Sequence, residues 1–315
     1  MFEHLIGIVY LYHTIIVNSV ILIVIGIPAY NEEKNIARII VKLQKLADKI
    51  IVCNDGSSDS TGIIAEKMGA IVVNHPKNLG YGAGIRSIFL KASELDSDIL
   101  VTFDADGQHR VEDIQVVLEP IIKNEADIVI GSRFLSGDNK NVPAYRKVGI
   151  KTITNITNTS TDLNLTDSQS GFRAYNKKVL KDIVPSEYGM GVSTEILIKA
   201  SKREYKIKEV PITVLYEGDT STHHPVSHGI SVILSTMKFV SIEHPLKFYG
   251  VPGLIFLSIG LFFIVWTIEE FTATRQVWTN ISLIGIGSII LGTMLTMTSI
   301  MLYSLINVVR ERRSD

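Results

Sequence analysis

Cysteine is nearly absent from this chain, because Cys53 is the only one among 315 residues. An intrachain disulfide is therefore excluded, as expected for a protein of a reducing compartment. An excess of either charge is also missing, since 31 lysines and arginines are balanced by 32 aspartates and glutamates, which leaves a net charge of -1. No strong field is available to attract nucleic acid, and we expect no nucleic-acid partner.

Charged side chains are missing from two long segments near the C-terminus. The mean hydropathy of +0.26 is high for a purely soluble protein, and the excess lies in Val251–Ile268 and Ile281–Val309. Each segment is long enough to cross a hydrocarbon core of about 30 Å. Buried core helices are the weaker alternative at these lengths. We therefore expect a two-span hairpin over residues 246–309, with the lipid bilayer as a partner.

The flanking charges predict the orientation of this hairpin. Lys247 precedes the first span, and a basic tail at 310–315 follows the second, whereas the connecting loop Glu269–Asn280 carries two glutamates and only Arg275. The positive-inside rule then places the large N-terminal region and the C-terminus in the cytoplasm. We expect a multi-pass protein of the cell membrane.

The N-terminal apolar stretch has two interpretations. Residues 5–27 are compatible with a third span or an uncleaved signal anchor. His13 and Asn18 interrupt the run, however, and no small-residue cleavage site is evident. We favour a buried parallel strand over Ile21–Ile27, which leaves residues 1–18 as an extension, either a peripheral helix or a mis-assigned start.

Apolar strands and amphipathic helices alternate between residues 21 and 131. We expect strands over 21–27, 49–53, 70–73, 99–103 and 127–131, and helices over 32–47, 82–95 and 112–123, with a short helix ending at 68. This alternation implies a parallel sheet covered by helices on both faces.

The pattern weakens after Phe134. We expect a polar loop at 136–141, a helix within 142–161, an irregular stretch at 163–175, a helix over 192–201, and a strand pair or edge strand over 207–216. A linker at 217–225 leads to an amphipathic helix within 227–245, whose position just before the first span favours the membrane interface.

Two carboxylates and an amide directly follow the strand expected at 99–103. Asp104, Asp106 and Gln108 occupy alternate positions, and alternate side chains of a strand point to the same side. Ligands of open α/β sheets bind at the carboxyl ends of the strands. Oxygen ligands of this kind suit Mg²⁺ or Mn²⁺, with substrate phosphates as further ligands. A solvated turn is the alternative for such a triplet taken alone.

Six motifs follow one another along the chain, most of them at the ends of successive strands. They are 28–33 (Pro-Ala-Tyr-Asn-Glu-Glu), 54–59 (Asn-Asp-Gly-Ser-Ser-Asp), 78–86 (Asn-Leu-Gly-Tyr-Gly-Ala-Gly-Ile-Arg), 104–108 (Asp-Ala-Asp-Gly-Gln), 131–134 (Gly-Ser-Arg-Phe) and 167–173 (Asp-Ser-Gln-Ser-Gly-Phe-Arg). Each motif is common, but the ordered set resembles glycosyltransferase family 2 over residues 20–228. The motifs at 131–134 and 170–175 resemble its polyprenyl-phosphate glycosyl synthases, as does a two-span tail.

The resemblance implies an A-type glycosyltransferase fold, an α/β fold with a Rossmann-like, mostly parallel sheet, as a cytoplasmic catalytic domain over 19–226. It implies that Pro28 and Tyr30 form a wall for the nucleotide base and that Glu32 and Asp55 accept hydrogen bonds from the base or ribose. The alternatives are loop packing for Pro28 and Tyr30, and turn stabilisation for Asp55.

The resemblance also assigns the metal. Asp106 and Gln108 would hold Mg²⁺ or Mn²⁺, while Asp104 would contact the sugar or ribose, with Ala105 beside it in the donor site. The cation would neutralise charge on the leaving nucleoside diphosphate. Glycines 80, 82 and 84 are not a dinucleotide fingerprint, and we expect them to let a helix N-terminus approach the donor.

Arginines are the expected clamps for an acceptor phosphate, because the guanidinium fork matches phosphate oxygens. The resemblance points to Arg133 and Arg146, with Arg133 also in the donor site, and Arg173 in the same region; surface salt bridges are the alternative. A phosphate acceptor is already an anion, so Asp167 need only position other groups. Glu195 either orients the donor sugar, supports other site residues or caps a helix. The expected catalytic set is Asp104, Asp106, Arg133 and Arg146.

The sequence thus suggests a metal-dependent inverting transferase that moves a sugar from a nucleotide-sugar donor to polyprenyl or dolichyl phosphate. Ser168 and Gln169 before Ser170, together with the linker at 222–228, depart from the mannose type and favour UDP-glucose or UDP-N-acetylglucosamine over GDP-mannose. Self-association is left open. We expect no zinc site at His223, His224 and His228.

Three other functions are alternatives to this one. A processive polysaccharide synthase is disfavoured because the Gln-x-x-Arg-Trp motif is absent, both tryptophans lying at 266 and 278. A transferase for another lipid or glycan remains an alternative. A catalytically silent scaffold is disfavoured by the intact Asp104, Asp106 and Gln108.

Overall fold

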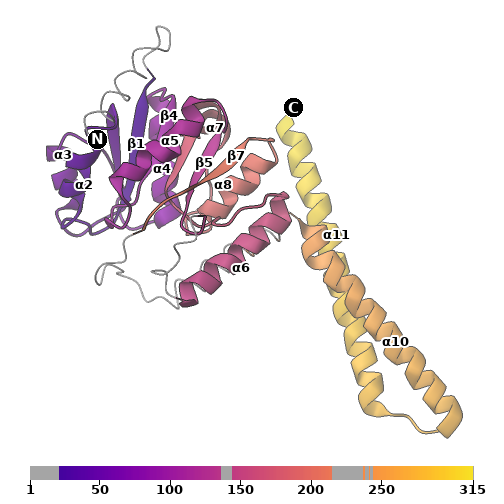
Figure 1. The fold of residues 1–315 in the computed structure, drawn as a ribbon. Coiled ribbons are helices and arrows are strands. Elements are labelled where there is room, and N and C mark those ends of the chain that lie inside the picture. Colours follow the sequence, from indigo (N-terminus) through magenta and orange to yellow (C-terminus); the bar gives the residue numbers. More distant parts are fainter. Residues whose placement is uncertain (1–20, 136–143, 215–236, 238–240, 242–243, 315) are drawn as a thin grey trace. The chain divides into compact units, whose positions relative to one another are not determined.

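The computed structural model describes residues 21–135, 144–214, 237, 241 and 244–314 (Figure 1). The chain divides into two units, Met1–Ile233 and Leu234–Asp315, which we describe separately. Several expectations lie outside the described residues: the extension at 1–18, the loop at 136–141, the three linker histidines and nearly all of the helix expected within 227–245.

The first unit is built on a seven-stranded sheet of order β3-β2-β1-β4-β6-β5-β7. The strands are β1 (Ile23–Ala29), β2 (Lys49–Asn54), β3 (Ile71–Asn74), β4 (Ile99–Thr102), β5 (Ile128–Ser132), β6 (Arg173–Asn176) and β7 (Ile207–Pro211). Only β6 runs antiparallel to its neighbours. The mostly parallel sheet is confirmed, and β1 supports the strand interpretation of Ile21–Ile27.

Helices cover both faces of this sheet (Figure 1). They are α2 (Ile36–Leu43), α3 (Thr61–Lys67), α4 (Tyr81–Glu94), α5 (Ile114–Ile122), α6 (Ala144–Thr161), α7 (Lys177–Asp182) and α8 (Val192–Ser201). Apolar side chains of α2 and α5 pack with one set of strand residues, and those of α4, α7 and α8 with the other. The alternation of strand side chains thus gives two hydrophobic layers.

Strand β6 corrects the expectation of an irregular stretch at 163–175. Its residue Arg173 pairs with Thr102 of β4 and with Ile130 of β5. Because β6 runs against both neighbours, its amino end lies at the edge of the sheet where β4 and β5 have their carboxyl ends. The residues just before β6 are thereby placed beside the motifs that follow those two strands.

The second unit is a helical hairpin of α10 (Val251–Thr274) and α11 (Thr279–Ser314), preceded by a π-helical turn at Leu246–Gly250. Two stretches, Leu246–Thr274 and Thr279–Ile306, are long and apolar enough to cross a membrane. Glycines seven residues apart on each helix allow close contact, because a Cβ at Gly253 would meet the carbonyl of Gly292, and one at Gly260 would meet that of Gly285. Small residues at such contacts are typical of membrane helix pairs.

Candidate active site

Two loops at the carboxyl ends of β1 and β2 are joined by hydrogen bonds. The Asn31 side chain accepts a bond of 2.9 Å from the Ser58 amide, and the Asn31 amide donates to the Ser57 hydroxyl at 3.0 Å. The Glu32 amide donates to the Thr61 hydroxyl at 2.7 Å. These bonds hold the loop at 28–33, which is predicted to contact the donor, in place. The Tyr30 ring stays exposed. Pro28 packs against α4, where a Cβ on Gly84 would lie 3.3 Å from its ring.

The Asp55 carboxylate forms hydrogen bonds within the protein. Its Oδ1 lies 2.6 Å from Nδ1 of His75 and accepts from the Leu79 amide at 2.9 Å, while its Oδ2 accepts from the Gly80 amide at 2.9 Å. The carboxylate is buried. Asp55 therefore stabilises the turn that follows β2, and its contact with the nucleotide base remains a prediction.

The glycines at 80 and 82 accommodate a segment of the same chain. The carbonyl of Tyr188 accepts from the Gly82 amide at 2.8 Å, and a Cβ on Gly82 would collide with the carbonyl of Glu187. The 187–189 loop therefore provides the hydrogen-bond acceptor for amides in the first turn of α4. This differs from the expectation that these glycines bring the helix N-terminus to the donor, because the loop occupies that position.

The Asp104–Gln108 segment forms a turn beyond β4, which ends at Thr102. Gly107 has a φ of +73°, a conformation that glycine adopts without strain, and the Gln108 amide donates to Oδ1 of Asp106 at 2.9 Å. Asp106 thus lies on a turn, and the strand alternation that the sequence suggested does not extend to it. Ala105 is buried in the core, so only its backbone is available to a ligand.

Negative charge accumulates around this turn. Burial raises the pKa of Glu32, and the nearby carboxylates of Asp106, Asp59 and Asp104 raise it further, which outweighs the hydrogen bond from Asn35. Burial is the larger cause of the raised pKa of Glu32, and repulsion by the like charges of these carboxylates adds to it. A bound cation would remove the repulsion.

The residues present fit a divalent cation whose coordination is completed by a substrate. Among the described residues no three histidine, cysteine, aspartate or glutamate side chains converge as metal ligands. Asp106 and the amide oxygen of Gln108 would then provide the protein ligands, on one turn. Mg²⁺ is commonly held by one or two carboxylates plus phosphate oxygens and water.

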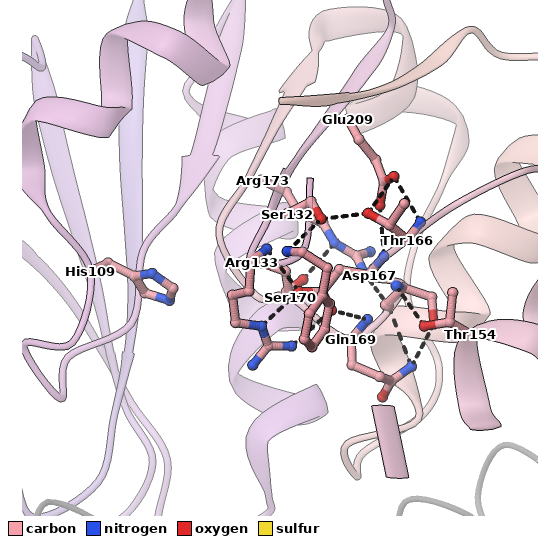
Figure 2. Close-up of polar contacts among 12 residues, drawn as sticks. His109, Ser132, Arg133, Thr154, Thr166, Asp167, Gln169, Ser170, Arg173 and Glu209 are labelled. Atoms are coloured by element: carbon pink, nitrogen blue, oxygen red, sulfur yellow. Dashed lines mark hydrogen bonds and ion pairs between the residues drawn. The ribbon is translucent and has the colours of Figure 1, made fainter. Parts of the chain in front are cut away.

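Arg133 follows β5 and is fixed by a buried carboxylate (Figure 2). Its Nε and one terminal nitrogen donate to the two oxygens of Asp167 at 2.6 and 2.8 Å. The side chain of Asp167 is 0% exposed, and that of Arg133 is 19% exposed. Burial alone would raise the pKa of Asp167, but the Arg133 guanidinium and its hydrogen bonds hold it below the ordinary value. Asp167 is therefore ionised, and both of its oxygens accept hydrogen bonds from Arg133.

A second carboxylate, from the edge strand, holds the turn that carries Asp167. Glu209 of β7 accepts from the amides of Thr166 and Asp167, each at 2.8 Å. The Thr166 hydroxyl is 2.9 Å from Glu209 and 2.6 Å from the Ser132 hydroxyl (Figure 2). The position of Arg133 thus depends on contacts that link β5, β7 and the segment before β6.

Arg173 and Glu195 are occupied within the protein. The Arg173 side chain is buried and donates to the carbonyls of Ser168, Ser170 and Ser193 at 2.7–3.0 Å. Arg173 therefore connects β6 to α8. This role differs from the phosphate clamp that was considered from the sequence. The buried Glu195 carboxylate accepts from the amide of Ser186 at 2.8 Å and lies 2.6 Å from Lys199.

Ser168 and Gln169, on which the preference for a UDP-sugar was based, lie between helices. The Gln169 amide nitrogen donates to the hydroxyls of Thr194 on α8 and Ser168 at 3.0 and 3.1 Å. Ser168 in turn lies 3.1 Å from the hydroxyl of Thr154 on α6. These residues therefore connect α6 and α8 to the segment that holds Arg133. Arg146 lies in the first turn of α6, and its side chain is outside the described set.

Sequence reasoning missed three polar residues of this site, Tyr81, His109 and Glu209. Tyr81 and His109 each lie 3.2 Å from an oxygen of Asp104. The available signals were weak: His109 directly follows Gln108, and Tyr81 stands between two glycines. Glu209 gave no signal, because its partners lie more than 40 residues away in the sequence.

Comparison with known proteins adds independent findings. Residues 24–184 match the sequence model of the glycosyl transferase family 2. The chain is 37% identical over 239 residues to the UDP-N-acetylglucosamine–dolichyl-phosphate N-acetylglucosaminyltransferase of Methanococcus voltae, covering 69% of this chain and 93% of the relative. It is 30% identical over 220 residues to the dolichyl-phosphate hexose transferase of Haloferax volcanii, with the same two coverages.

A solved structure supports the fold. Glucosyl-3-phosphoglycerate synthase of Mycobacterium tuberculosis, in complex with Mn²⁺, uridine diphosphate and phosphoglyceric acid, aligns with a TM-score of 0.57 and 20% identity over 75% of this chain and 82% of the other. The expected A-type glycosyltransferase fold is confirmed. With the family match over half of its length, this chain belongs to glycosyl transferase family 2.

Proposed function

We propose that this protein transfers a sugar from a nucleotide-sugar to a polyprenyl (dolichyl) phosphate at a membrane. The observation that carries the proposal is the fixed Arg133 beside the acidic turn. Its guanidinium is held by Asp167. Burial acts to raise the pKa of Asp104, but the contacts with His109 and Tyr81, and then the charge of the nearby Arg133, hold it below the ordinary value. A cation-binding turn and an anion-binding arginine at one edge of the sheet suit a diphosphate donor and a phosphate acceptor.

On the donor side, Asp106 and Gln108 would hold Mg²⁺ or Mn²⁺. When bound, the cation supplies Lewis-acid stabilisation of the leaving nucleoside diphosphate. Asp104 would contact the ribose or sugar, with Pro28, Tyr30 and Glu32 around the nucleoside. Solved structures of the same fold contain Mn²⁺ or Mg²⁺ with uridine diphosphate, which supports the metal proposal for this chain.

On the acceptor side, Arg133 and Arg146 would bind the phosphate of the lipid. A phosphate monoester is an anion near neutral pH, so its oxygen attacks the anomeric carbon without help from a general base. Asp167 suits this chemistry because its carboxylate is buried and already paired. A neutral hydroxyl acceptor would instead need a carboxylate able to take its proton.

The apolar hairpin would anchor the protein in the bilayer that contains the acceptor. The charge distribution around the two spans favours a cytoplasmic catalytic domain. Relatives at 37% and 30% identity have names that specify dolichyl phosphate. We favour UDP-N-acetylglucosamine or UDP-glucose as the donor, with GDP-mannose as the alternative.

A donor screen tests the proposal. Purified full-length protein in detergent, Mg²⁺ or Mn²⁺, and a short polyprenyl phosphate would be incubated with each labelled nucleotide-sugar in turn. We expect one UDP-sugar to give a single-sugar lipid product that is lost on chelation of the metal. Transfer from GDP-mannose alone would replace the donor assignment, a polymeric product would favour a polysaccharide synthase, and no transfer from any donor would contradict the proposal.

Asp106→Ala provides the variant arm of this screen. Loss of a carboxylate ligand should abolish transfer, because removal of groups that hold a catalytic centre together costs orders of magnitude in rate. Glu66→Ala is the matched control, since Glu66 is an exposed carboxylate on α3. Equal transfer by the Asp106→Ala variant and the wild type would refute the metal assignment.

A further inference from the structure

We propose that His109 and Tyr81 are positioning residues for Asp104: they fix the orientation of the carboxylate that meets the ribose or sugar of the donor. The inference rests on the proposed function and deepens its donor site. Each residue contacts one oxygen of Asp104, and the two come from different parts of the chain, the first turn of α4 and the end of the acidic turn.

His109 is built into the protein with one defined hydrogen-bonding role. Its side chain is 8% exposed, and its ring packs against Phe103 and Phe172 at centroid distances of 5.9 and 5.2 Å. Nε2 lies 3.2 Å from Oδ2 of Asp104, whereas Nδ1 is buried and has no hydrogen-bond partner among the described residues.

This environment selects the tautomer of His109. A proton on Nδ1 would be a buried N–H without an acceptor, and Nε2 would then direct a lone pair at a carboxylate. Leaving a buried donor unsatisfied is costly. The proton therefore resides on Nε2, and His109 donates to Asp104. The imidazole keeps an unpaired acceptor in an apolar environment, an arrangement that packing alone does not require, because phenylalanine would fill the same space.

Tyr81 is the complementary donor. Its hydroxyl lies 3.2 Å from Oδ1 of Asp104. Burial raises the pKa of this phenol well above its ordinary value, and the neighbouring Asp104 charge raises it further. Tyr81 therefore remains protonated and donates. With His109 on Oδ2, each carboxylate oxygen has one protein donor, which fixes the rotation of the carboxylate about its Cβ–Cγ bond.

Gly171 completes the arrangement on a third side. A Cβ at this position would lie 3.0 and 3.1 Å from the two oxygens of Asp104 and would collide with the Tyr81 hydroxyl. The carboxylate thus packs against bare backbone, and its position is restricted by contacts on three sides. Its side chain is nevertheless 25% exposed, so lone pairs remain accessible to the hydroxyl donors of a sugar.

The test separates the hydrogen bond from the packing. His109→Phe keeps a ring between Phe103 and Phe172 but removes the N–H donor, whereas His109→Gln retains an N–H. Both hydrogen bonds exist before the donor binds, so their loss acts through the orientation of Asp104. The resulting loss of donor affinity should reach at most about 10- to 100-fold, the scale of a hydrogen bond to a charged group. We expect this effect in His109→Phe and Tyr81→Phe as a raised KM for the nucleotide-sugar and weaker donor binding by calorimetry. We also expect an unchanged KM for polyprenyl phosphate and partial recovery in His109→Gln.

Stability and a matched control decide whether a change is specific. His109→Phe removes a buried unsatisfied acceptor but also the hydrogen bond to Asp104, so the melting temperature of each variant is measured beside its kinetics to confirm that it is folded under the assay conditions. Tyr205→Phe is the control, because Tyr205 also donates to a carboxylate, Asp182, elsewhere on the protein, and it should leave every kinetic parameter unchanged.

Each outcome is informative. If the wild type is inactive with every donor, the proposed function fails. If the wild type is active and His109→Phe folds with an unchanged donor KM, the positioning inference fails while the function stands. If His109→Phe does not fold, Tyr81→Phe decides, since it leaves His109 intact, and an unchanged donor KM in that variant overturns the inference.

Discussion

Asp104 and Asp167 lie at the same edge of the sheet, but their surroundings differ. Asp104 is contacted by a phenol and an imidazole and is 25% exposed. Asp167 is 0% exposed and paired with the Arg133 guanidinium through both oxygens. Two donors that each contact one oxygen orient the Asp104 carboxylate and leave part of it exposed to a ligand, whereas both oxygens of Asp167 are bound by Arg133.

From this contrast we propose that Asp104, and not Asp167, is the aspartate that meets the substrate. A carboxylate that is oriented and partly exposed is suited to bind a ligand. A buried, fully paired carboxylate is suited to hold its partner in place, and here the partner is the more exposed Arg133. Substitutions at the two positions should therefore separate effects on chemistry from effects on folding.

The largest contrast is expected between Asp104→Ala and Asp167→Ala. Removing one partner of a buried ion pair typically costs about 3–5 kcal/mol, so Asp167→Ala should lower the melting temperature markedly. Asp104→Ala should keep the fold and lose transfer. Far-UV circular dichroism in detergent suits the measurement, because both tryptophans lie in the hairpin unit and not in the catalytic unit. Equal melting temperatures for the two variants would remove the proposed distinction.

A smaller effect is expected from Asp167→Asn, which keeps the shape of the side chain but loses its charge. Arg133 would be held less firmly, and the KM for polyprenyl phosphate should rise by about tenfold, the usual scale for a weakened charged hydrogen bond. The KM for the nucleotide-sugar should stay unchanged. A large fall in kcat with loss of one limb of the pH–rate profile would instead identify Asp167 as a general base.

The part of the site that follows from parallel strands could be predicted from sequence. The ends of β1, β2, β4 and β5 bring the motifs to one edge, because parallel strands have their carboxyl ends together. Asp104, Asp106 and Arg133 were placed correctly at this edge by that rule. The nearly continuous apolar runs of these strands, which alternate with amphipathic helices, allowed their positions to be predicted.

The rest depends on contacts between distant segments. Strand β6 spans only Arg173–Asn176 and begins with an arginine, which reads as a surface residue until its three carbonyl partners are known. The pairing of Arg133 with Asp167 spans 34 residues, and that of Asp167 with Glu209 spans 42. Local patterns contain no information about such pairs. The sequence therefore allowed a positioning role for Asp167 but did not identify Arg133 as its partner, and it did not show that Arg173 is occupied by backbone carbonyls.

The pH dependence of stability should reflect Asp167. Its pKa in the folded protein is below the ordinary value of 3.8, so the unfolded chain binds more protons around that pH. The stabilisation is present above 3.8 and is lost as the pH falls through the lowered pKa. The stability difference between the wild type and Asp167→Asn should therefore shrink as the pH decreases in this range. Thermal melts at a series of pH values measure it, and a difference that grows on acidification would contradict the assignment.

The smallest expected effect concerns Glu32, whose pKa is shifted in the opposite direction. Its folded-state pKa lies above the ordinary value of 4.5, mainly because of burial and then the charges of Asp106, Asp59 and Asp104. The folded chain therefore binds more protons, and this contribution to stability is lost as the pH rises through the raised pKa. At neutral pH without divalent cations, Glu32→Gln should slightly raise the melting temperature.

A cation at the acidic turn should cancel this gain. With Mg²⁺ and a nucleoside diphosphate bound near Asp106, the charge on Glu32 would no longer be repelled, so the melting temperature of Glu32→Gln should approach that of the wild type. Glu66→Gln, exposed on α3, is the matched control and should show no dependence on Mg²⁺. A gain in Glu32→Gln that persists unchanged with Mg²⁺ and nucleotide would mean that no cation binds near these carboxylates. The contrast between Asp104 and Asp167 would then concern protein stability alone.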